Sequence, residues 1–496
     1  MLGAVPQENG AVELTVWAPT ARSLAVHTAG CAHPLGRGDD GLFTGSFPGV
    51  HGDAYLLRVD DGDTFPDPCS RAQPYGVRGP SAVVDTRRFE GERLGLSLDG
   101  LVIYELHVGT FTDEGTFDAA ATRLPMLRDL GVTAVELMPI ATFPGERGWG
   151  YDGLYTSAPH PEYGGPDGFA RLVAAAHEAG LGVILDVVYN HVGPGNEALT
   201  AFAPYFSSKH ETFWGDALDY ETRGVREWAV QNAELWTRDY HVDGLRLDAV
   251  HAIFDDSPEH ICAELKRRVG DALVISEMEI GDWRPIDEWG HDAQWADQLH
   301  HELHVLLTGE NDGYYADYGS IHGIVAALGG FGHDPRRLVV CAQDHDQVGN
   351  RALGDRLPAD ALRVAAAVYL FSTCTPMLFM GEEHLEPHTF QFFTDHIDPE
   401  IAEATREGRR KEFEAFASFS GSEIPDPQDV RTFLRSKVSD DRSPDPLYRR
   451  LLELHRKLPR ELEVVEADED AKRLRLRRGH VVLDVDFANR TVAVRD

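Results

Sequence analysis

Carboxylates and histidines occur at the ends of apolar, strand-like runs, a pattern that indicates acid and nucleophilic chemistry. The run GLRLD places Arg246 and Asp248 on one side of a strand, because side chains alternate along it. A neighbouring guanidinium keeps a carboxylate ionised at neutral pH, so Asp248 can act as a nucleophile. Other runs end in Glu277 and in the pair His345 and Asp346. One carboxylate that attacks and one carboxyl that donates a proton suit cleavage of a glycosidic bond.

Neighbouring residues compete for some of these roles. Glu279 has the same parity as Glu277 and could be the acid instead, and Asp344 competes with the aspartate two residues later. A further run, DVVYNH, ends in Asp186 and His191. Asp186 suits the ordering of a loop through hydrogen bonds. His191, like the histidine of the DHD segment, could bind sugar or only support its strand end.

Other enzyme classes fit the sequence less well. It contains no HExxH metal motif, no GxxxxGK[ST] or GxGxxG motif at a strand-to-helix turn, and no GxSxG elbow. We therefore expect no nucleotide cofactor and no metal. His300, His301 and His304 form the segment HHELH, which we interpret as one face of a helix near the cleft, with a zinc site as the less favoured alternative.

The composition indicates which kinds of partner the protein binds and in which cellular compartment it works. The 496 residues carry 46 Lys and Arg against 82 Asp and Glu, a net charge of −36 that disfavours nucleic acid and suits neutral substrates. The five cysteines are far apart without CxxC spacing, so we expect reduced core residues. The N-terminus lacks a signal-like segment, and no apolar stretch has membrane length. These features predict a cytoplasmic protein without a membrane partner.

The elements that must position the chemistry alternate between apolar strands and amphipathic helices. Eight such units predict a (β/α)₈ TIM barrel, whose chemistry lies at the C-terminal ends of its strands. The helices are expected near residues 118–130, 167–180, 223–238, 257–269, 355–370 and 447–457. The strands are expected at 101–107, 133–139, 182–188, 244–248, 272–277, 293–295, 338–342 and 376–381.

Two smaller β domains flank the barrel in this interpretation. Residues 1–92 contain half-buried strand patterns separated by turns, which predict an N-terminal β-sandwich. Residues 93–459 form the barrel, with insertions after the third strand (190–222) and the eighth (384–446) that shape a cleft. Residues 460–496 predict a short C-terminal β-sheet with room for about three strands.

The segments DVVYNH, GLRLDAVH, ISE and DHDQVGN resemble, in order and spacing, the four signature regions of the alpha-amylase superfamily. Longer segments, among them YELHVGTFTDEGTF, WGYDGLY, WADQLHHELHVLLTGE and GEEHLEPHTFQFFTDHIDPE, resemble the malto-oligosyltrehalose trehalohydrolase family. The resemblance covers nearly the whole chain. It implies retaining hydrolysis of the α-1,4 bond next to a terminal trehalose unit, which releases trehalose and a shortened malto-oligosaccharide. It also implies a synthase that makes this substrate.

Carried over by position, the resemblance gives each site residue a role. Asp248 would be the nucleophile, Glu277 the general acid and base, and Asp346 the third acid that holds sugar hydroxyls. The carboxyl groups of a retaining pair lie roughly 5 to 5.5 Å apart. Arg246 would keep the nucleophile ionised. His191 and His345 would bind the sugar in the cleaved subsite.

Aromatic rings stack on the apolar faces of glucose, so the resemblance also suggests where the sugar binds. Tyr151 is the best candidate, with Trp149 and Asp152 close to it in WGYDGLY. Trp214, Phe392 and Phe393 suit core packing equally well. The matching segments add His251, Asp297 and His301 as substrate-binding residues.

Two departures and two rival functions accompany the resemblance. The segment SEMEIGDWRP is more apolar than the run that follows the acid in many relatives, and the C-terminal region is short. Asn190 stands where many amylases bind calcium, without an acidic partner loop like theirs.

Glycogen branching enzymes share the four regions and transfer the glycosyl unit to sugar instead of water. A non-catalytic glucan-binding protein is disfavoured because all three acids are present.

Overall fold

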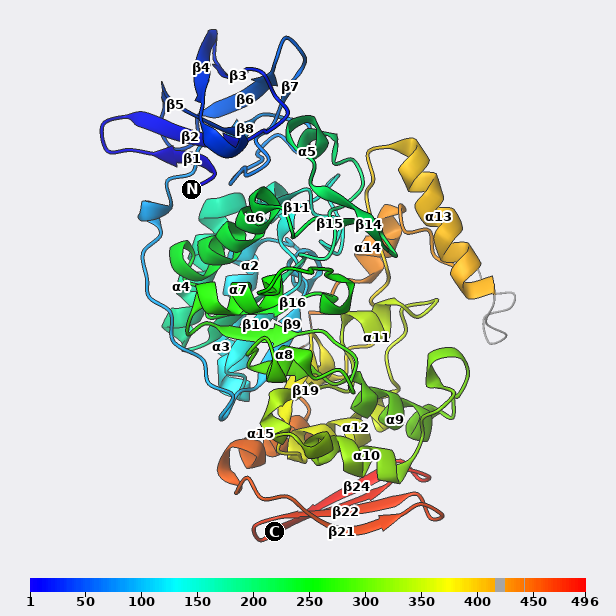
Figure 1. The fold of residues 1–496 in the computed structure, drawn as a ribbon. Helices are drawn as coiled ribbons and strands as arrows, with labels where there is room; N and C mark the ends of the chain where they lie inside the picture. Colours follow the sequence, from blue (N-terminus) through cyan, green and yellow to red (C-terminus); the bar gives the residue numbers. More distant parts are fainter. Residues whose placement is uncertain (415–423, 441) are drawn as a thin grey trace.

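A closed barrel of eight parallel strands forms the centre of the computed structural model, which describes residues 1–414, 424–440 and 442–496 (Figure 1). Neighbouring strands follow the order β10-β13-β16-β17-β18-β19-β20-β9. The predicted TIM barrel is therefore confirmed. Its strands are β9 (Ile103–Leu106), β10 (Ala134–Leu137), β13 (Gly182–Val187), β16 (Gly244–Leu247), β17 (Leu273–Ser276), β18 (Ala293–Trp295), β19 (Leu338–Val340) and β20 (Thr375–Phe379).

Polar and apolar side chains occupy different levels inside the barrel. Ile103, Ile184 and Ile275 belong to one apolar cluster inside the barrel. Two residues further along β9 and β13, the inward positions carry Glu105 and Asp186, both buried. A polar layer therefore lies just below the C-terminal strand ends, where TIM barrels carry their active sites.

Helices cover the outside of the barrel close to the predicted positions. The helix expected over 118–130 is wrong in one respect, because it is split into α2 (Phe117–Ala121) and α3 (Leu124–Leu130) with Pro125 in the first turn of α3. The helix expected over 223–238 begins as α6 (Arg223–Glu234) and continues as a π-helix, η4 (Leu235–Asp239). Further helices around the barrel are α4 (Gly165–Ala179), α7 (Ile261–Val269), α9 (Asp297–Thr308), α10 (Ile321–Leu328), α12 (Ala359–Phe371) and α15 (Pro446–Lys457).

The N-terminal region is an antiparallel sheet folded over itself. Strand β4 pairs with β3 through its first five residues and with β5 through its last two, which joins the two halves. Phe47 and Tyr55 pack across the halves with ring centroids 5.6 Å apart, as in a sandwich. Its strands are β1 (Gly3–Pro6), β2 (Ala11–Trp17), β3 (Leu24–Thr28), β4 (Cys31–Arg37), β5 (Leu42–Pro48), β6 (Ala54–Val59), β7 (Thr64–Phe65) and β8 (Ser81–Ala82).

The C-terminal sheet has four antiparallel strands, one more than the sequence predicts. The additional strand, β21 (Glu463–Asp468), lies at an edge with its first three residues exposed, so its sequence EVVEAD lacks a clear alternation. The other strands are β22 (Arg473–Arg478), β23 (Val481–Asp486) and β24 (Thr491–Arg495). The predicted domain boundaries at residues 92 and 459 stay a prediction and fall between these sheets and the barrel.

The two predicted insertions contain structure of their own. The first holds α5 (Glu197–Phe202) and a hairpin of β14 (Phe206–Thr212) and β15 (Gly215–Leu218). The second holds α13 (Pro399–Glu414) and α14 (Val430–Arg435). In Figure 1 the hairpin and α13 lie on the same side of the barrel.

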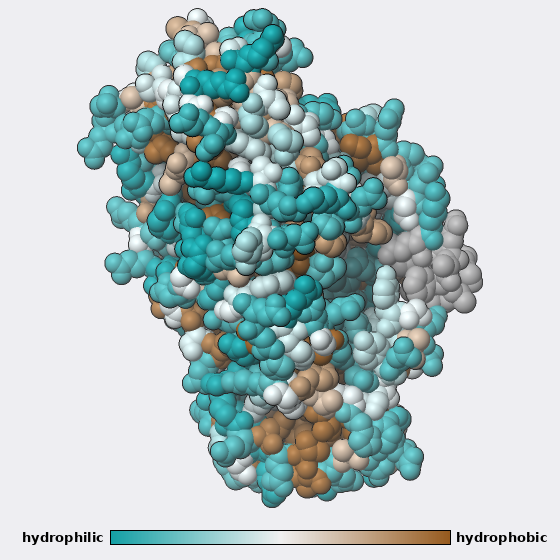
Figure 2. All heavy atoms as spheres, viewed as in Figure 1, coloured by the Kyte–Doolittle hydropathy of each residue, from teal (hydrophilic) through white to brown (hydrophobic). Residues whose placement is uncertain are grey.

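The surface is mostly hydrophilic on the face in view, and hydrophobic residues gather at its lower end, over α10 and the C-terminal sheet (Figure 2). None of the helices in the described ranges is both long and apolar enough to cross a membrane. The five cysteines are free; three are buried, but Cys31 is exposed at the start of β4, so the expectation of core residues is wrong there.

Candidate active site

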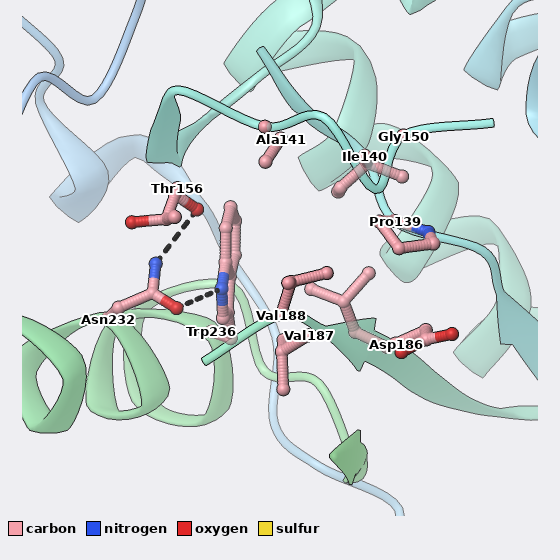
Figure 3. Close-up of a pocket in the computed structure, with 12 residues that line it drawn as sticks. Pro139, Ile140, Ala141, Gly150, Thr156, Asp186, Val187, Val188, Asn232 and Trp236 are labelled. Carbon is pink, nitrogen blue, oxygen red and sulfur yellow. Dashed lines mark hydrogen bonds between the residues drawn. The ribbon is translucent and has the colours of Figure 1, made fainter. Parts of the chain in front are cut away.

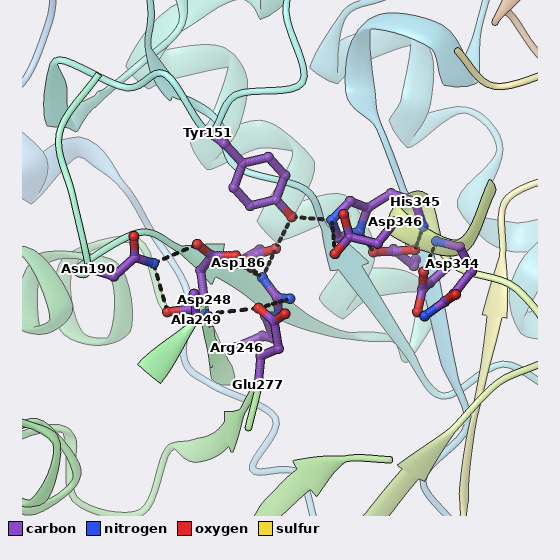
Figure 4. Close-up of polar contacts among 12 residues, drawn as sticks. Tyr151, Asp186, Asn190, Arg246, Asp248, Ala249, Glu277, Asp344, His345 and Asp346 are labelled. Atoms are coloured by element: carbon purple, nitrogen blue, oxygen red, sulfur yellow. Dashed lines mark hydrogen bonds and ion pairs between the residues drawn. The ribbon is translucent and has the colours of Figure 1, made fainter. Parts of the chain in front are cut away.

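Arg246 binds three carboxylates at the mouth of the barrel (Figure 4). The register of β13 and β16 places Asp186 opposite Arg246, and the guanidinium Nη1 lies 2.7 Å from an oxygen of Asp186. The same nitrogen lies 2.7 Å from Asp248 Oδ1, and Nη2 lies 2.8 Å from Glu277 Oε2. The guanidinium carbon stands 4.1 Å from the ring centroid of Trp295. Because Arg246 is fully buried, these contacts fix its position.

Asp248 directly follows β16 and is held by hydrogen bonds to both carboxylate oxygens. Oδ1 accepts from Arg246, and Oδ2 accepts from Asn190 Nδ2 at 2.6 Å. The same amide donates to the main-chain oxygen of Asp248 at 3.0 Å. About a tenth of the Asp248 side chain is exposed. A carboxylate held in this way and still reachable from the mouth suits a nucleophile.

Glu277 directly follows β17, and its environment keeps it protonated near neutral pH. Burial raises its pKa to about 8, with the charges of Asp248 and Asp346 adding to the effect and that of Arg246 opposing it. Its Oε2 accepts from the main-chain N–H of Ala249 at 2.9 Å. Ala249 adopts a left-handed conformation with φ 39°, which is uncommon for a residue with a Cβ. A proton-bearing carboxyl near an ionised one is the pair that glycoside cleavage needs.

The competing acid Glu279 lies apart from this cluster. Its side chain is exposed, whereas Glu277 faces Arg246 and the strand end of Asp248. Its main-chain oxygen accepts from Gln294 Nε2 of β18 at 3.2 Å, which holds the segment after β17 against the neighbouring strand. This geometry favours Glu277 as the acid.

Asp346 and His345 begin the short helix α11 (His345–Gly349). About a third of the Asp346 side chain is exposed, and one oxygen lies 3.3 Å from His345 Nε2. Burial opposes ionisation, but the charge and hydrogen bond of His345 outweigh it and lower the pKa of Asp346 to about 2. Asp344 is buried and caps α11 by accepting from the N–H of Gln347 at 2.7 Å. Asp346 is therefore the aspartate that faces the mouth.

Tyr151 joins the two halves of the site. Its hydroxyl donates to Asp186 Oδ2 at 2.6 Å and lies 2.8 Å from His345 Nε2. Its ring stacks on the imidazole of His345 with centroids 5.2 Å apart. Figure 4 shows the Tyr151 hydroxyl in contact with both Asp186 and His345. The aromatic ring predicted as a sugar platform thus also connects Asp186, Arg246 and His345.

His191 contacts protein on both ring nitrogens. Nδ1 pairs with Asn190 Oδ1, and Nε2 lies 3.1 Å from the main-chain oxygen of Tyr151. Its ring stacks on Trp214, which is 47% exposed at the tip of the β14–β15 hairpin. These contacts hold His191 against Asn190, and its binding of sugar stays a prediction. Trp214 presents an accessible ring beside the site. Nearby Asp152 is partly exposed and lies 3.8 Å from His396 Nε2.

Several other predicted substrate residues lie behind or beside the mouth. Trp149 is only 5% exposed, stacks on Phe390 and donates its indole N–H to Gln391, so it supports the wall of the site. Phe393 is fully buried, whereas Phe392 is partly buried. His251 is exposed on the turn after β16.

Asp297 and the HHELH segment lie on α9. Burial and the charge of Asp346 raise the pKa of Asp297 to about 6. His300 contacts the main-chain oxygen of Ala342 at 2.6 Å, and His304 Nε2 contacts Glu310 at 2.9 Å. His301 packs on Tyr318 with centroids 4.7 Å apart. All three histidines of α9 also pack around the ring of Tyr315. Among the described residues no cluster of His, Cys, Asp or Glu could hold a metal ion.

A separate cavity lies between the barrel wall and α6 (Figure 3). Val187 and Trp236 line it together with Asn232, whose amide donates to the main-chain oxygen of Thr156 at 2.8 Å. Val187 and Leu185 point to the opposite side of β13 from Asp186, towards the helices. The cavity is lined mostly by apolar residues, and Asp186 of the catalytic cluster also belongs to its lining.

Three contributors to the site were not found from the sequence in these roles. Asn190 binds Asp248, the N–H of Ala249 binds Glu277, and Glu105 binds His345. Asn190 and Ala249 lie inside the recognised segments, but their partners depend on how the strands are placed. Glu105 lies one residue before the end of the first barrel strand, and that position is the one signal that could have identified it.

Comparisons with known proteins agree with this arrangement. A family model described as "Alpha amylase, catalytic domain" matches residues 104–216. A malto-oligosyltrehalose trehalohydrolase of Saccharolobus solfataricus is 43% identical over 87% of this chain and 82% of its own length. The malto-oligosyltrehalose trehalohydrolase of Rhizobium sp. (strain M-11) is 40% identical over 98% of this chain and 92% of its own length. A 1,4-alpha-glucan branching enzyme of Kitasatospora aureofaciens is 30% identical over 77% of this chain and 58% of its own length.

Solved structures show the same fold. A putative alpha amylase from Salmonella typhimurium superposes with a TM-score of 0.89 at 36% identity, covering 97% of this chain and 92% of that chain. A GBS pullulanase in complex with maltotetraose has a TM-score of 0.75 at 18% identity, covering 98% and 80%. The second similarity shows the fold alone.

Proposed function

Because the chain belongs to the malto-oligosyltrehalose trehalohydrolase family of the alpha-amylase superfamily, we propose that its site cleaves the α-1,4 bond next to a terminal trehalose. The protein is a glycoside hydrolase. The substrate is a malto-oligosyltrehalose, and the products are trehalose and a malto-oligosaccharide. The observation that carries the proposal is the contact of one guanidinium, that of Arg246, with both Asp248 and Glu277.

Asp248 acts as the nucleophile in this proposal. Its carboxylate attacks C1 of the glucose in the cleaved subsite while Glu277 gives its proton to the glycosidic oxygen. The C1–O bond breaks, trehalose leaves with the proton, and a glycosyl ester to Asp248 remains. The pKa of Glu277, raised to about 8 by burial, supports the acid role at neutral pH.

Water completes the reaction. Glu277, now ionised, takes a proton from water as the oxygen attacks C1, and the ester bond to Asp248 breaks. Two inversions at C1 restore the α configuration of the new reducing end. Asp346 is ionised, and it holds the sugar hydroxyls that flank the cleaved bond.

The remaining predicted features belong to the same proposal. Tyr151 and the exposed Trp214 offer ring faces to the glucan chain. The further substrate-binding residues of this proposal are Asp152, Asp297, His251 and His301. A synthase that builds the terminal trehalose must supply the substrate. The free cysteines support a cytoplasmic location.

The test compares maltotriosyltrehalose with maltopentaose by chromatography of the products. We expect the wild-type protein to release trehalose and maltotriose quickly and to attack maltopentaose poorly, and Asp248→Asn to be inert. A branching enzyme would instead form α-1,6 bonds on linear glucan. Equal cleavage or rearrangement of maltopentaose would contradict the trehalose specificity.

A further inference from the structure

Glu105 lies at the C-terminal end of β9 and binds His345 twice. Its Oε2 accepts from the main-chain N–H of His345 at 2.9 Å, and its Oε1 lies 2.5 Å from the imidazole Nδ1. Both side chains are 1% exposed. The contact therefore joins the first barrel strand to the start of α11, which carries Asp346.

The hydrogen-bond directions at Tyr151 locate one proton on His345. The tyrosine has a single hydroxyl proton, which it donates to Asp186 Oδ2 at 2.6 Å. Its oxygen therefore accepts from His345, so Nε2 carries a proton. On the other side of the ring, Nδ1 can contact the Glu105 carboxylate at 2.5 Å only if a proton lies between them.

We propose that Glu105 is a positioning residue for the hydrolysis: it holds a second proton on His345, so that a charged, fixed imidazolium keeps Asp346 ionised and in place. The role of Glu105 rests on the proposed function, in which Asp346 binds the sugar at the cleaved bond. Glu105 itself touches no reacting atom. It acts through the ring of His345, as a carboxylate behind a functional histidine does elsewhere.

The electrostatic surroundings agree with this geometry. The pKa of His345 is raised well above its ordinary value, since the charges of Asp346 and Glu105 outweigh the burial that opposes a cation. The titratable groups that interact with His345 come from several elements: Glu105 from β9, His107 directly after it, Glu136 from β10, Tyr151 from the loop after β10, Asp186 from β13, Asp297 from α9, and Asp344 and Asp346 from its own segment.

Glu136 supplies a matched control in the same layer of the barrel. It stands opposite Glu105 in the register of β9 and β10 and is equally buried. Neither of its carboxyl oxygens has a hydrogen-bond partner among the described residues, and burial with the charge of Glu105 raises its pKa well above the ordinary value. Burial thus favours the neutral form of Glu136, whose shape and charge a glutamine in its place reproduces.

The experiment measures kcat and KM on maltotriosyltrehalose between about pH 5 and 8.5 for wild type, Glu105→Gln and Glu136→Gln. For Glu105→Gln we expect kcat to fall at least tenfold at about pH 7.5, more than KM changes, with recovery towards the wild-type value near pH 5.5, where the imidazole regains its proton. Glu136→Gln should follow wild type throughout. A loss in Glu105→Gln that is equal at all pH values, or no loss, would overturn the proposal.

A second measurement needs only the wild-type protein. Nitrogen NMR of histidine-labelled protein, with the signal of His345 assigned from His345→Gln, should show both ring nitrogens protonated at about pH 7. A neutral ring would overturn the role of Glu105 even if Glu105→Gln failed to fold. If wild type instead released no trehalose, the proposed function would fail, while the nitrogen signal would still report on the contact between Glu105 and His345.

Discussion

The Nη2 atom of Arg246 lies 2.8 Å from Oε2 of Glu277, so a cation touches the group that must donate a proton. A guanidinium in contact lowers the pKa of a carboxyl, which would leave Glu277 ionised. Burial, and the two aspartates that face the same space, outweigh the cation and raise the pKa to about 8. The acid therefore keeps its proton at neutral pH chiefly because it is buried, and the two aspartates add to this effect.

This balance predicts the alkaline side of the pH profile. The rate constant kcat/KM on malto-oligosyltrehalose should fall as the pH rises through about 8, because Glu277 then loses the proton that the leaving oxygen needs. Glu277→Gln should lose about 10²- to 10⁴-fold in kcat and should no longer show this fall. The measurement is a steady-state pH profile.

The neighbouring Glu279→Gln is the control for that experiment. Because Glu279 is exposed, its variant should keep the activity and the pH profile of wild type. An inactive Glu279→Gln beside an active Glu277→Gln would exchange the two assignments.

Arg246 should matter for stability as well as for rate. Arg246→Met leaves buried Asp186 and part of the Asp248 carboxylate without their cation, which should cost about 3 to 5 kcal/mol in the free energy of unfolding. Arg246→Lys keeps the charge but cannot reach three carboxylates at once, so we expect a smaller loss of stability and a fall in kcat of roughly 100-fold or more. Thermal unfolding and initial rates measure both.

An exposed arginine provides the comparison. Arg267 pairs with Glu259 at the surface, and Arg267→Met should change the free energy of unfolding by less than about 1 kcal/mol. If Arg246→Met had the same free energy of unfolding as wild type, the three contacts of Arg246 would contribute nothing to stability.

Trp214 should contribute to binding of the glucan chain. Its ring is 47% exposed and fixed against His191, so a sugar can stack on the free side. Trp214→Ala should raise KM by roughly fivefold, equivalent to about 1 kcal/mol, with little change in kcat or in the melting temperature. Phe213→Ala is the control, because this side chain is 95% exposed at the hairpin tip. A larger effect of Phe213→Ala than of Trp214→Ala would contradict the stacking role.

The barrel could be predicted because its strands are short apolar runs that end in charged residues. Asp248 and Glu277 stand at strand ends in the sequence itself, and their order is a recognisable pattern. Their partners were harder to predict, since Asp186 and Arg246 are 60 residues apart and Glu105 and His345 are 240 apart. Such contacts depend on strand register and barrel closure, which no local pattern encodes.

Local sequence patterns do not reveal every strand of the small β domains. Strand β4, with the sequence CAHPLGR, contains Pro34 and Gly36 and lacks the apolar alternation of its neighbours. The sequence predicts Trp149 as a substrate-binding residue because it is in the same motif as Tyr151. The side chain is instead buried and packs against His345 and Phe390. A motif identifies a wall of the site, but packing decides which of its side chains faces the substrate.

The most direct test of the central claim is a proton NMR time course of maltotriosyltrehalose hydrolysis, which reports bond and stereochemistry together. We predict that trehalose appears with maltotriose and that the new reducing end is the α anomer at first, changing to the mixture only by later mutarotation. An initial β anomer would contradict attack by Asp248. Products other than trehalose and maltotriose would contradict the proposed bond.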